Sequence, residues 1–147
     1  MIGCILTGHG EFATGLSHSL TMIAGEQTNF EVVPFKEELP LKEFEETLSY
    51  QLTKLLKVTK GVVIFCDLLG GTPFNTAMVQ SLHLENVAVI AGTNLPLLIE
   101  GSLLRLTAED ASQLANHLVT VGRESLLVAQ VPKFEGNIAE DLIEEGI

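Results

Sequence analysis

The stretch Val62-Val-Ile-Phe-Cys-Asp67-Leu-Leu-Gly-Gly-Thr-Pro73 decides the fold that we expect for this chain. Its first five residues are all apolar, as in a strand of a parallel sheet that helices cover on both faces. The strand ends at Asp67, and a turn with two glycines follows. Thr72-Pro73 then predicts a helix start, with a hydroxyl residue at the N-cap and proline at the first helical position. This order indicates one unit of an α/β fold.

The N-terminal stretch Gly3-Cys-Ile-Leu-Thr-Gly-His9-Gly10 has the same organisation. An apolar strand reaches one ionisable residue, His9, which two glycines flank. Over residues 12–23 the apolar residues then recur at spacings of four and three, which predicts one face of a helix. Gly25 is the expected C-terminal stop of that helix.

The rest of the chain continues this alternation. We expect further strands at 30–35 and 87–91 and further helices at 41–55, 72–82 and 96–106. Thr107 and Asp110 resemble a capping pair for a last helix that runs past Gly122. Residues 126–131 are ambiguous between the end of this helix and a strand.

Strands and helices at this spacing predict a single α/β domain with three αβα layers and a mostly parallel sheet. We expect the strand order 2-1-3-4. In such sheets a ligand binds at the carboxyl ends of the strands, where the strand order reverses. That reversal lies between strands one and three, which end in His9 and Asp67, so the topology predicts that these side chains meet.

Composition and charge limit the class of protein. The 147 residues are 46% hydrophobic with a mean hydropathy of +0.35, which is typical of one globular domain. The apolar runs are too short to cross a bilayer and the N-terminus lacks a signal-peptide pattern, so we expect a cytoplasmic protein. Eight Lys and Arg against 19 Asp and Glu give a net charge of −11. This charge argues against nucleic-acid binding and favours protein partners with basic surfaces.

His9 and Asp67 together predict a site of histidine chemistry. A carboxylate that accepts from Nδ1 orients the imidazole, leaves Nε2 as the nucleophile and stabilises a charged ring. Gly71 and Thr72 precede a predicted helix, whose N–H groups and dipole favour an anion. Gly10 lets the backbone of the turn approach a ligand closely. We therefore expect a phosphohistidine site, with His9 and Asp67 catalytic and Gly10, Gly71 and Thr72 binding the phosphoryl group.

Other chemistries are disfavoured by what the sequence lacks. It contains neither the G-x-x-x-x-G-K-[ST] loop of P-loop NTPases nor the G-x-S-x-G elbow of α/β-hydrolases. The four histidines show no ligand spacing, so we expect no metal, and the chemistry requires no organic cofactor. Cys4 and Cys66 lie inside apolar runs and are interpreted as buried hydrophobic residues.

Three motifs in this order resemble one protein family. They are Leu6-Thr-Gly-His9-Gly, Asp67-Leu-Leu-Gly-Gly-Thr-Pro-Phe-Asn75 and Ile90-Ala-Gly-Thr-Asn-Leu-Pro96. Over residues 1–130 the chain is similar to the IIA components of the mannose family of the bacterial phosphoenolpyruvate:sugar phosphotransferase system (PTS). Each motif alone is weak evidence, whereas the three together are specific.

The resemblance implies a phosphocarrier enzyme. His9 would accept a phosphoryl group on Nε2 from phospho-HPr and pass it to a histidine of the cognate IIB protein, which phosphorylates sugar at a membrane complex of IIC and IID. Asp67 would hold the imidazole, and Gly71 and Thr72 would contact the phosphoryl oxygens. Family members are homodimers that exchange a C-terminal strand, for which residues 126–131 are the candidate.

The resemblance also implies a domain organisation. Residues 1–131 would form the IIA domain and residues 132–147 an acidic tail, without the linker and IIB domain of fused members. The form of the Asp67 motif leans toward the N-acetylgalactosamine-type branch. Gluconate and fructose systems have similar IIA proteins, however, and other subunits determine which sugar is recognised.

Three alternatives stay open. The phosphoryl donor subunit of a dihydroxyacetone kinase also uses an early histidine, although the Gly-Gly-Thr-Pro segment argues against it. A receiver domain would be phosphorylated on Asp67, yet it needs an acidic pair at the end of strand one, where this chain has Thr7-Gly8-His9. The third alternative is a regulatory binding module with this fold and no transfer activity.

Overall fold

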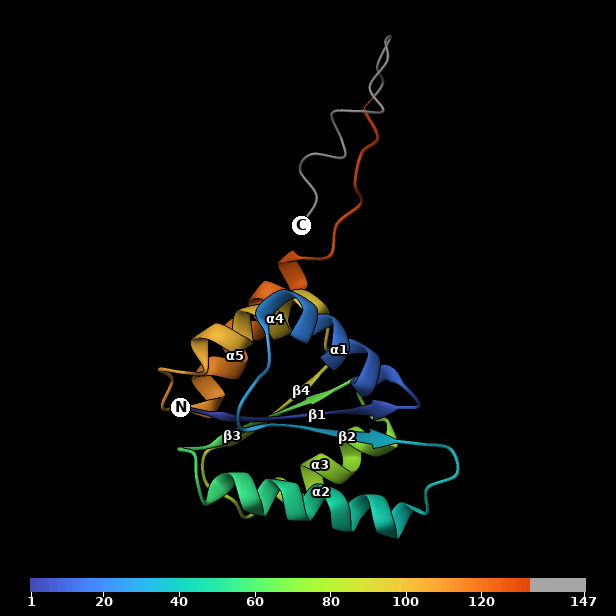
Figure 1. Ribbon diagram of the computed structural model, residues 1–147, viewed down its shortest axis with the longest axis vertical. Helices are drawn as coiled ribbons and strands as arrows, with labels where there is room; N and C mark the ends of the chain where they lie inside the picture. The colour runs from blue at the N-terminus through green and yellow to red at the C-terminus, as the bar shows by residue number, and fades with distance from the viewer. Residues whose placement is uncertain (133–147) are drawn as a thin grey trace.

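Four parallel strands form the sheet at the centre of the computed structural model, which describes residues 1–132 (Figure 1). The strands are β1 (Gly3–His9), β2 (Phe30–Phe35), β3 (Val62–Cys66) and β4 (Val87–Ala91). Their order is β2-β1-β3-β4, and every neighbouring pair is parallel. The predicted order is confirmed, and β1 and β3 are neighbours.

Within the described residues, five helices cover the two faces of this sheet. They are α1 (Phe12–Ala24), α2 (Leu41–Leu56), α3 (Thr72–Ser81), α4 (Leu95–Leu104) and α5 (Ala111–Glu124). Helices α1, α4 and α5 pack on one face, and α2 and α3 pack on the other (Figure 1). The three-layer αβα architecture is confirmed. No helix within residues 1–132 combines the length and the apolar composition that crossing a membrane requires.

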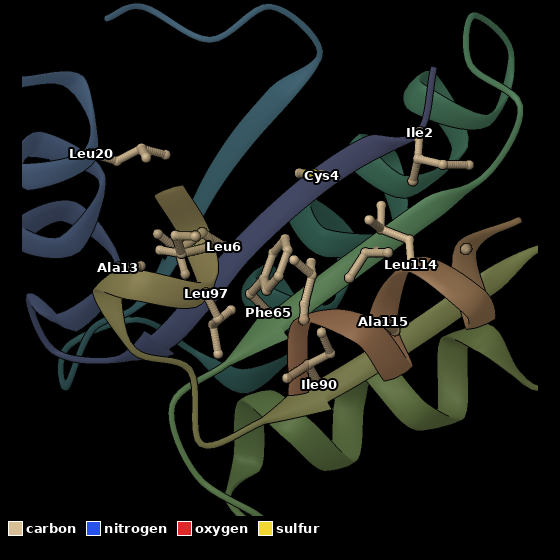
Figure 2. Packing of buried hydrophobic residues seen from close by; sticks show 14 residues of the cluster. Ile2, Cys4, Leu6, Ala13, Leu20, Phe65, Ile90, Leu97, Leu114 and Ala115 are labelled. Carbon is tan, nitrogen blue, oxygen red and sulfur yellow. The ribbon is translucent and has the colours of Figure 1, made fainter. Parts of the chain in front are cut away.

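The strands divide their side chains between two hydrophobic cores, because successive residues of a strand point to opposite faces. On β1, Cys4 and Leu6 pack under α1, α4 and α5, whereas Ile5 packs against α2 and α3. On β3, Phe65 and Ile64 divide in the same way. Figure 2 shows Leu6 and Phe65 within the first core. Burial on both faces explains why β1 and β3 are continuous apolar runs in the sequence.

Two helix starts differ from the sequence expectation. The N-cap of α3 is Gly71, and Thr72 is already the first helical residue. The N-cap of α5 is Asp110, whose carboxylate accepts a hydrogen bond from the N–H of Gln113 at 2.8 Å. Thr107 takes no part in this cap, because an N-cap oxygen bonds the N–H groups two or three residues further on.

Arg105 links several segments at the amino edge of the sheet. It follows α4 directly and is 1% exposed. Its guanidinium donates to the carbonyl of Thr28 at 2.8 Å and to Oε1 of Gln27 at 3.1 Å, both in the turn before β2. Its own carbonyl accepts from the N–H of Ile2 at 2.8 Å. Arg105 therefore joins three separate segments, a role that the sequence analysis did not anticipate.

Asn86 forms a second link at the same edge. Its backbone lies in the left-handed region, with φ of 55°. Its Nδ2 donates to the carbonyls of Lys60 at 2.6 Å and Glu109 at 2.8 Å, and its Oδ1 accepts from the N–H of Ala111 at 2.7 Å. Gly61 makes room for it, because a Cβ there would lie 2.4 Å from Asn86. Both Nδ2 and Oδ1 of the Asn86 amide therefore have hydrogen-bond partners inside the protein.

The segment 126–131 is neither helix nor strand in this structure. Its apolar side chains are turned to solvent, with Leu127 75% and Val128 93% exposed. The exchange of this segment between two chains is therefore not shown. Residues 133–147, which make up nearly all of the expected acidic tail 132–147, lie outside the described residues.

Candidate functional site

Strands β1 and β3 bring His9 and Asp67 together at the carboxyl edge of the sheet. His9 is the last residue of β1, and Asp67 follows directly after β3. Nδ1 of His9 lies 2.7 Å from Oδ2 of Asp67. The same oxygen accepts the backbone N–H of His9 at 2.9 Å, and Oδ1 accepts the N–H of Leu68 at 2.8 Å. One carboxylate therefore holds both the main chain and the ring of His9.

The charge of Asp67 determines the tautomer of His9. Burial of Asp67, whose side chain is 10% exposed, acts to raise its pKa. The hydrogen bonds from the backbone and ring of His9 and from the N–H of Leu68 outweigh burial, so that the pKa lies below its ordinary value. An ionised carboxylate only accepts, so Nδ1 carries the proton. Nε2 of the neutral ring then has a free lone pair, on a side chain that is 44% exposed.

Two residues whose contacts the sequence analysis did not predict, Phe35 and Gly8, also position this pair. Phe35 ends β2 opposite His9, and its ring meets the imidazole edge-on with the centroids 5.7 Å apart. Gly8 gives Asp67 its space, because a Cβ on Gly8 would lie 3.0 Å from Cβ and Cγ of Asp67 and 2.6 Å from the ring of Phe12. The expected strand order contained the signal for Phe35, since it places the ends of strands one and two side by side.

Gly71, the N-cap of α3, adjoins the imidazole, and Thr72 follows it as the first helical residue. A Cβ on Gly71 would lie 2.8 Å from Cε1 of His9 and 3.7 Å from Nε2. Among residues 1–132, the N–H groups of Gly71 and Thr72 have no protein acceptor. They lie at the N-terminus of a ten-residue helix, whose dipole favours negative charge at this end. The arrangement suits an anion attached to Nε2.

Gly10 was expected to bind the phosphoryl group, but its observed contact is a different one. Its backbone has φ of 57°, a conformation that favours glycine, and its N–H donates to the carbonyl of Phe35 at 2.8 Å. That N–H is therefore already occupied in this structure. Gly10 shapes the turn after His9 and ties it to β2.

The loop between β3 and α3 is held from two sides. Nδ2 of Asn75 donates to the carbonyl of Gly70 at 2.9 Å, next to Gly71. The N–H of Gly92, in the turn after β4, donates to the carbonyl of Asp67 at 3.1 Å. These contacts fix the backbone on both sides of the site. Asn75 was part of the second sequence motif, but its role in supporting the loop becomes visible only in the structure.

The other candidate residues of the sequence lie apart from this site. His18 is on α1 and His117 is on α5. In the described part of the chain, no three His, Cys, Asp or Glu side chains gather as metal ligands. Cys4 and Cys66 are buried in the two cores, and burial raises the pKa of each thiol to about 12. Their interpretation as buried hydrophobic residues is confirmed.

Comparison with known proteins agrees with the resemblance that the motifs indicated. The family model described as "PTS system fructose IIA component" matches residues 3–119. The chain is 34% identical over 130 residues to the PTS system fructose-specific EIIA component of Bacillus subtilis (strain 168), covering 87% of this chain and 86% of that protein. It is also 34% identical over 125 residues to the PTS system mannose-specific EIIAB component of Escherichia coli (strain K12), covering 85% of this chain and 38% of that protein.

Solved structures give the same result. The mannose/sorbose specific IIA subunit from Enterococcus faecalis superposes with a TM-score of 0.78 at 28% identity, over 90% of this chain and 98% of that one. The phosphotransferase system component EIIA from Streptococcus agalactiae superposes with a TM-score of 0.76 at 29% identity, over 87% and 97% of the two chains. With its motifs, its fold and its relatives in agreement, this chain belongs to the IIA components of the mannose family of the PTS.

Proposed function

We propose that this protein is a phosphohistidine carrier of a sugar PTS. His9 takes a phosphoryl group from phospho-HPr on Nε2 and passes it to a histidine of a IIB protein. The IIB protein then phosphorylates sugar that enters through a IIC/IID membrane complex, so the carrier works in the cytoplasm. The observation that carries this proposal is the 2.7 Å contact between Nδ1 of His9 and Oδ2 of Asp67, because it leaves Nε2 unprotonated.

The proposed transfer requires little of the protein beyond positioning and charge. The lone pair of Nε2 attacks phosphorus, the bond from phosphorus to the donor's imidazole nitrogen breaks, and its electron pair returns to that nitrogen. The proton on Nδ1 stays between His9 and Asp67. The positive charge that forms on the His9 ring is then balanced by the carboxylate. Transfer to the IIB histidine follows the same steps with the roles exchanged.

The free N–H groups of Gly71 and Thr72 support the phosphoryl group in this proposal. They lie at the N-terminus of α3, where Gly71 adjoins the His9 ring and a doubly charged group is favoured. Gly10 has its N–H on Phe35, so we assign it to the shape of the turn. These residues and the His9–Asp67 pair need no metal or organic cofactor for the transfer.

The proposal is tested by incubation with phosphoenolpyruvate, enzyme I and HPr, followed by measurement of the intact mass. We expect one added phosphate that is labile to acid and stable to alkali. His9→Ala should remove it completely, whereas His18→Ala, which changes an exposed histidine on α1, should keep it. If His9→Ala is still phosphorylated, or if the wild-type chain stays unmodified while HPr is fully charged, the proposal is wrong.

We also propose that the carrier is a homodimer in which residues 126–131 of one copy cover the edge of β4 in the other. Within the described residues β4 pairs only with β3, and an open apolar edge normally needs a cover. A groove of about 370 Å³ follows this edge between α3 and α5, and Met78, Leu82 and Val89 are among its lining residues. The exposed Leu127 and Val128 supply an apolar strand for it.

Sedimentation equilibrium tests this assembly. The wild-type chain should have the mass of two copies, and Leu127→Asp should shift it toward one copy. Leu103→Asp, which changes another exposed leucine on α4, is the matched control and should stay dimeric. A monomeric wild-type chain, or a Leu127→Asp variant that dimerises as tightly as its control, would rule out this arrangement.

A further inference from the structure

A groove on the solvent side of α2 has no part in the chemistry or the assembly described above. Its volume is about 250 Å³, and its lining residues are Tyr50, Thr53, Lys54, Lys57 and Val58. We refer to it as the α2 groove. It lies at the C-terminal end of α2, where the following residue Lys60 bonds to the carbonyl of Met1 at the amino edge of the sheet. The groove is therefore remote from His9, which ends β1 at the carboxyl edge.

The α2 groove combines apolar and basic side chains that are open to solvent. Tyr50 is 67% and Val58 65% exposed. Lys54 pairs with Glu31 at 2.7 Å, whereas Lys57 has no acidic partner within residues 1–132. Exposed apolar side chains beside an unpaired cation indicate a surface for a ligand that carries both apolar and acidic groups.

The positive charge at this place contrasts with the rest of the chain. The net charge is −11, yet three of the eight Lys and Arg residues lie within residues 54–60. Lys60 pairs with Glu109, so that Lys57 keeps its charge uncompensated beside the groove. An acidic ligand is repelled by most of this protein and attracted here. The same net charge disfavours nucleic acid and anionic membranes as the ligand.

The C-terminal segment 133–147 has the composition that the α2 groove would attract. It contains five acidic residues and a single lysine. Its large apolar residues are Phe134, Ile138, Leu142, Ile143 and Ile147. The acidic residues complement Lys57, and the apolar residues suit contact with Tyr50 and Val58.

We infer that the α2 groove is a docking site for segment 133–147 of the other copy in the dimer. This inference rests on the proposed dimer, in which residues 126–131 of one copy lie along β4 of the other. The segment 133–147 then starts on the copy whose groove it fills. The trace after α5 runs away from its own domain up to residue 132, which favours a groove on another copy (Figure 1).

The length of the segment is sufficient for this contact. Fifteen extended residues span up to about 50 Å. A domain of this size has a radius of gyration of about 14 Å. Helices α2 and α3 cover the same face of the sheet, and β4 contributes Val87 and Val89 to the core beneath them. A segment that starts at β4 can therefore cross α3 and reach the solvent side of α2.

The contact is tested by cross-linking in the whole chain. Thr53→Cys places a thiol in the groove, and Gly146→Cys places one in the segment. Cys4 and Cys66 are buried and their thiols have a pKa of about 12, so that a bis-maleimide linker reacts with the introduced thiols. We expect two chains joined covalently, which a denaturing gel and the intact mass detect.

Thr47→Cys with Gly146→Cys is the matched control. Thr47 is another exposed threonine of α2, but it does not line the groove. This pair of thiols should give no more linked chains than Gly146→Cys alone. Equal linking through positions 53 and 47, or a link confined to a single chain, would overturn the inference.

A change of charge tests the role of Lys57. Lys57→Glu, added to the Thr53→Cys and Gly146→Cys chain, should slow linking about fivefold because repulsion replaces attraction. Lys42→Glu makes the same change at an exposed position in the first turn of α2 and should leave the rate unchanged. Equal rates in the two variants would also contradict the inference. The proposed dimer fails through a different result, a single-copy mass in sedimentation equilibrium, and the proposed carrier fails through an unphosphorylated His9.

Discussion

The two edges of the sheet use their polar side chains in opposite ways. At the amino edge, Arg105 and Asn86 bond to backbone groups of distant segments, and the Asn86 amide is fully used inside the protein. At the carboxyl edge, His9 and Asp67 hold each other, yet Nε2 and the N–H groups of Gly71 and Thr72 have no acceptor or donor within residues 1–132. The comparison teaches that a polar side chain whose hydrogen bonds are made inside the protein, such as the Asn86 amide, stabilises the fold. A side chain that is held in place but keeps an atom free, such as Nε2 of His9, can react with a ligand.

The largest effect should come from Asp67→Asn at the carboxyl edge. The amide of asparagine can donate to Nδ1, which moves the ring proton to Nε2 and removes the nucleophilic lone pair. We expect phosphoryl transfer to slow by about 100-fold or more, which corresponds to about 3 kcal/mol in the barrier. The measurement is the single-turnover rate with phospho-HPr.

Asp110→Asn is the matched control for this change. Asp110 caps α5 through a bond to Gln113, and asparagine caps helices equally well. Transfer and stability should both stay close to wild type. If both substitutions slow transfer alike, a general loss of charge, and not the orientation of His9, would explain the result.

Arg105→Leu should affect stability and leave the chemistry intact. The substitution removes the donors for the carbonyl of Thr28 and for Gln27, both at a buried site. Loss of hydrogen bonds from a buried charged group should cost about 2 kcal/mol of unfolding free energy, or roughly 4–8 °C in Tm for a domain of this size. The transfer rate per folded molecule should not change. Denaturant titration and single-turnover rates measure the two effects.

Arg123→Leu is the control for Arg105, because it makes the same change at an exposed position near the end of α5. Its unfolding free energy should stay within about 0.5 kcal/mol of wild type. Equal destabilisation by the two substitutions would mean that the amino edge has no special part in stability.

Gly71→Ala should slow transfer less, by about tenfold, or about 1.4 kcal/mol. The backbone of Gly71, with φ of −69°, accommodates alanine, so the effect comes from the methyl group against Cε1 of His9. Gly15→Ala is the control, since nothing lies within 4 Å of its Cβ position on α1. The NMR chemical shifts of the His9 ring should differ from wild type in Gly71→Ala and match wild type in Gly15→Ala. Unchanged shifts in Gly71→Ala would show that the loop adapts and that the contact is unimportant.

The smallest effect concerns pH. The folded pKa of Asp67 lies below its ordinary value of 3.8, so ionised Asp67 stabilises the folded state. This contribution is complete above the ordinary pKa and disappears as the pH falls through the lower, folded pKa. The difference in unfolding free energy between wild type and Asp67→Asn should therefore shrink below about pH 4. A difference that grows as the pH falls through this range would contradict the assigned direction.

Much of the carboxyl edge could be predicted from the sequence, because its residues follow local patterns. The unbroken apolar run of β3, the ionisable residue after it and the helix that starts near Thr72 are all neighbours in the chain. The strand order then placed His9 beside Asp67. The site roles of these residues remain proposals. The sequence analysis did not predict the hydrogen bond from the N–H of Gly10 to the carbonyl of Phe35.

The amino edge could not be predicted in this way. Arg105 lies between leucines at the end of α4 and bonds to Thr28, 77 residues earlier in the chain. No local pattern shows which carbonyls a buried guanidinium will meet. Thr107 was a misleading cap signal for a different reason, because Asp110 occupies the N-cap position and its carboxylate accepts from the N–H of Gln113. Residues 126–131 found no partner in a single chain, so their apolar pattern could not be resolved as helix or strand.

The position of His9 and Asp67 at the ends of adjacent strands has a consequence for heat resistance. Their separation follows from the spacing of paired strands, about 4.8 Å, and depends little on any loop. Warming that frays loops and helix ends should leave the pair intact until the sheet itself melts. Carrier activity and β-sheet circular dichroism should therefore be lost at the same temperature. If the protein is the phosphocarrier that we propose, its reactive pair would stay assembled for as long as the sheet does.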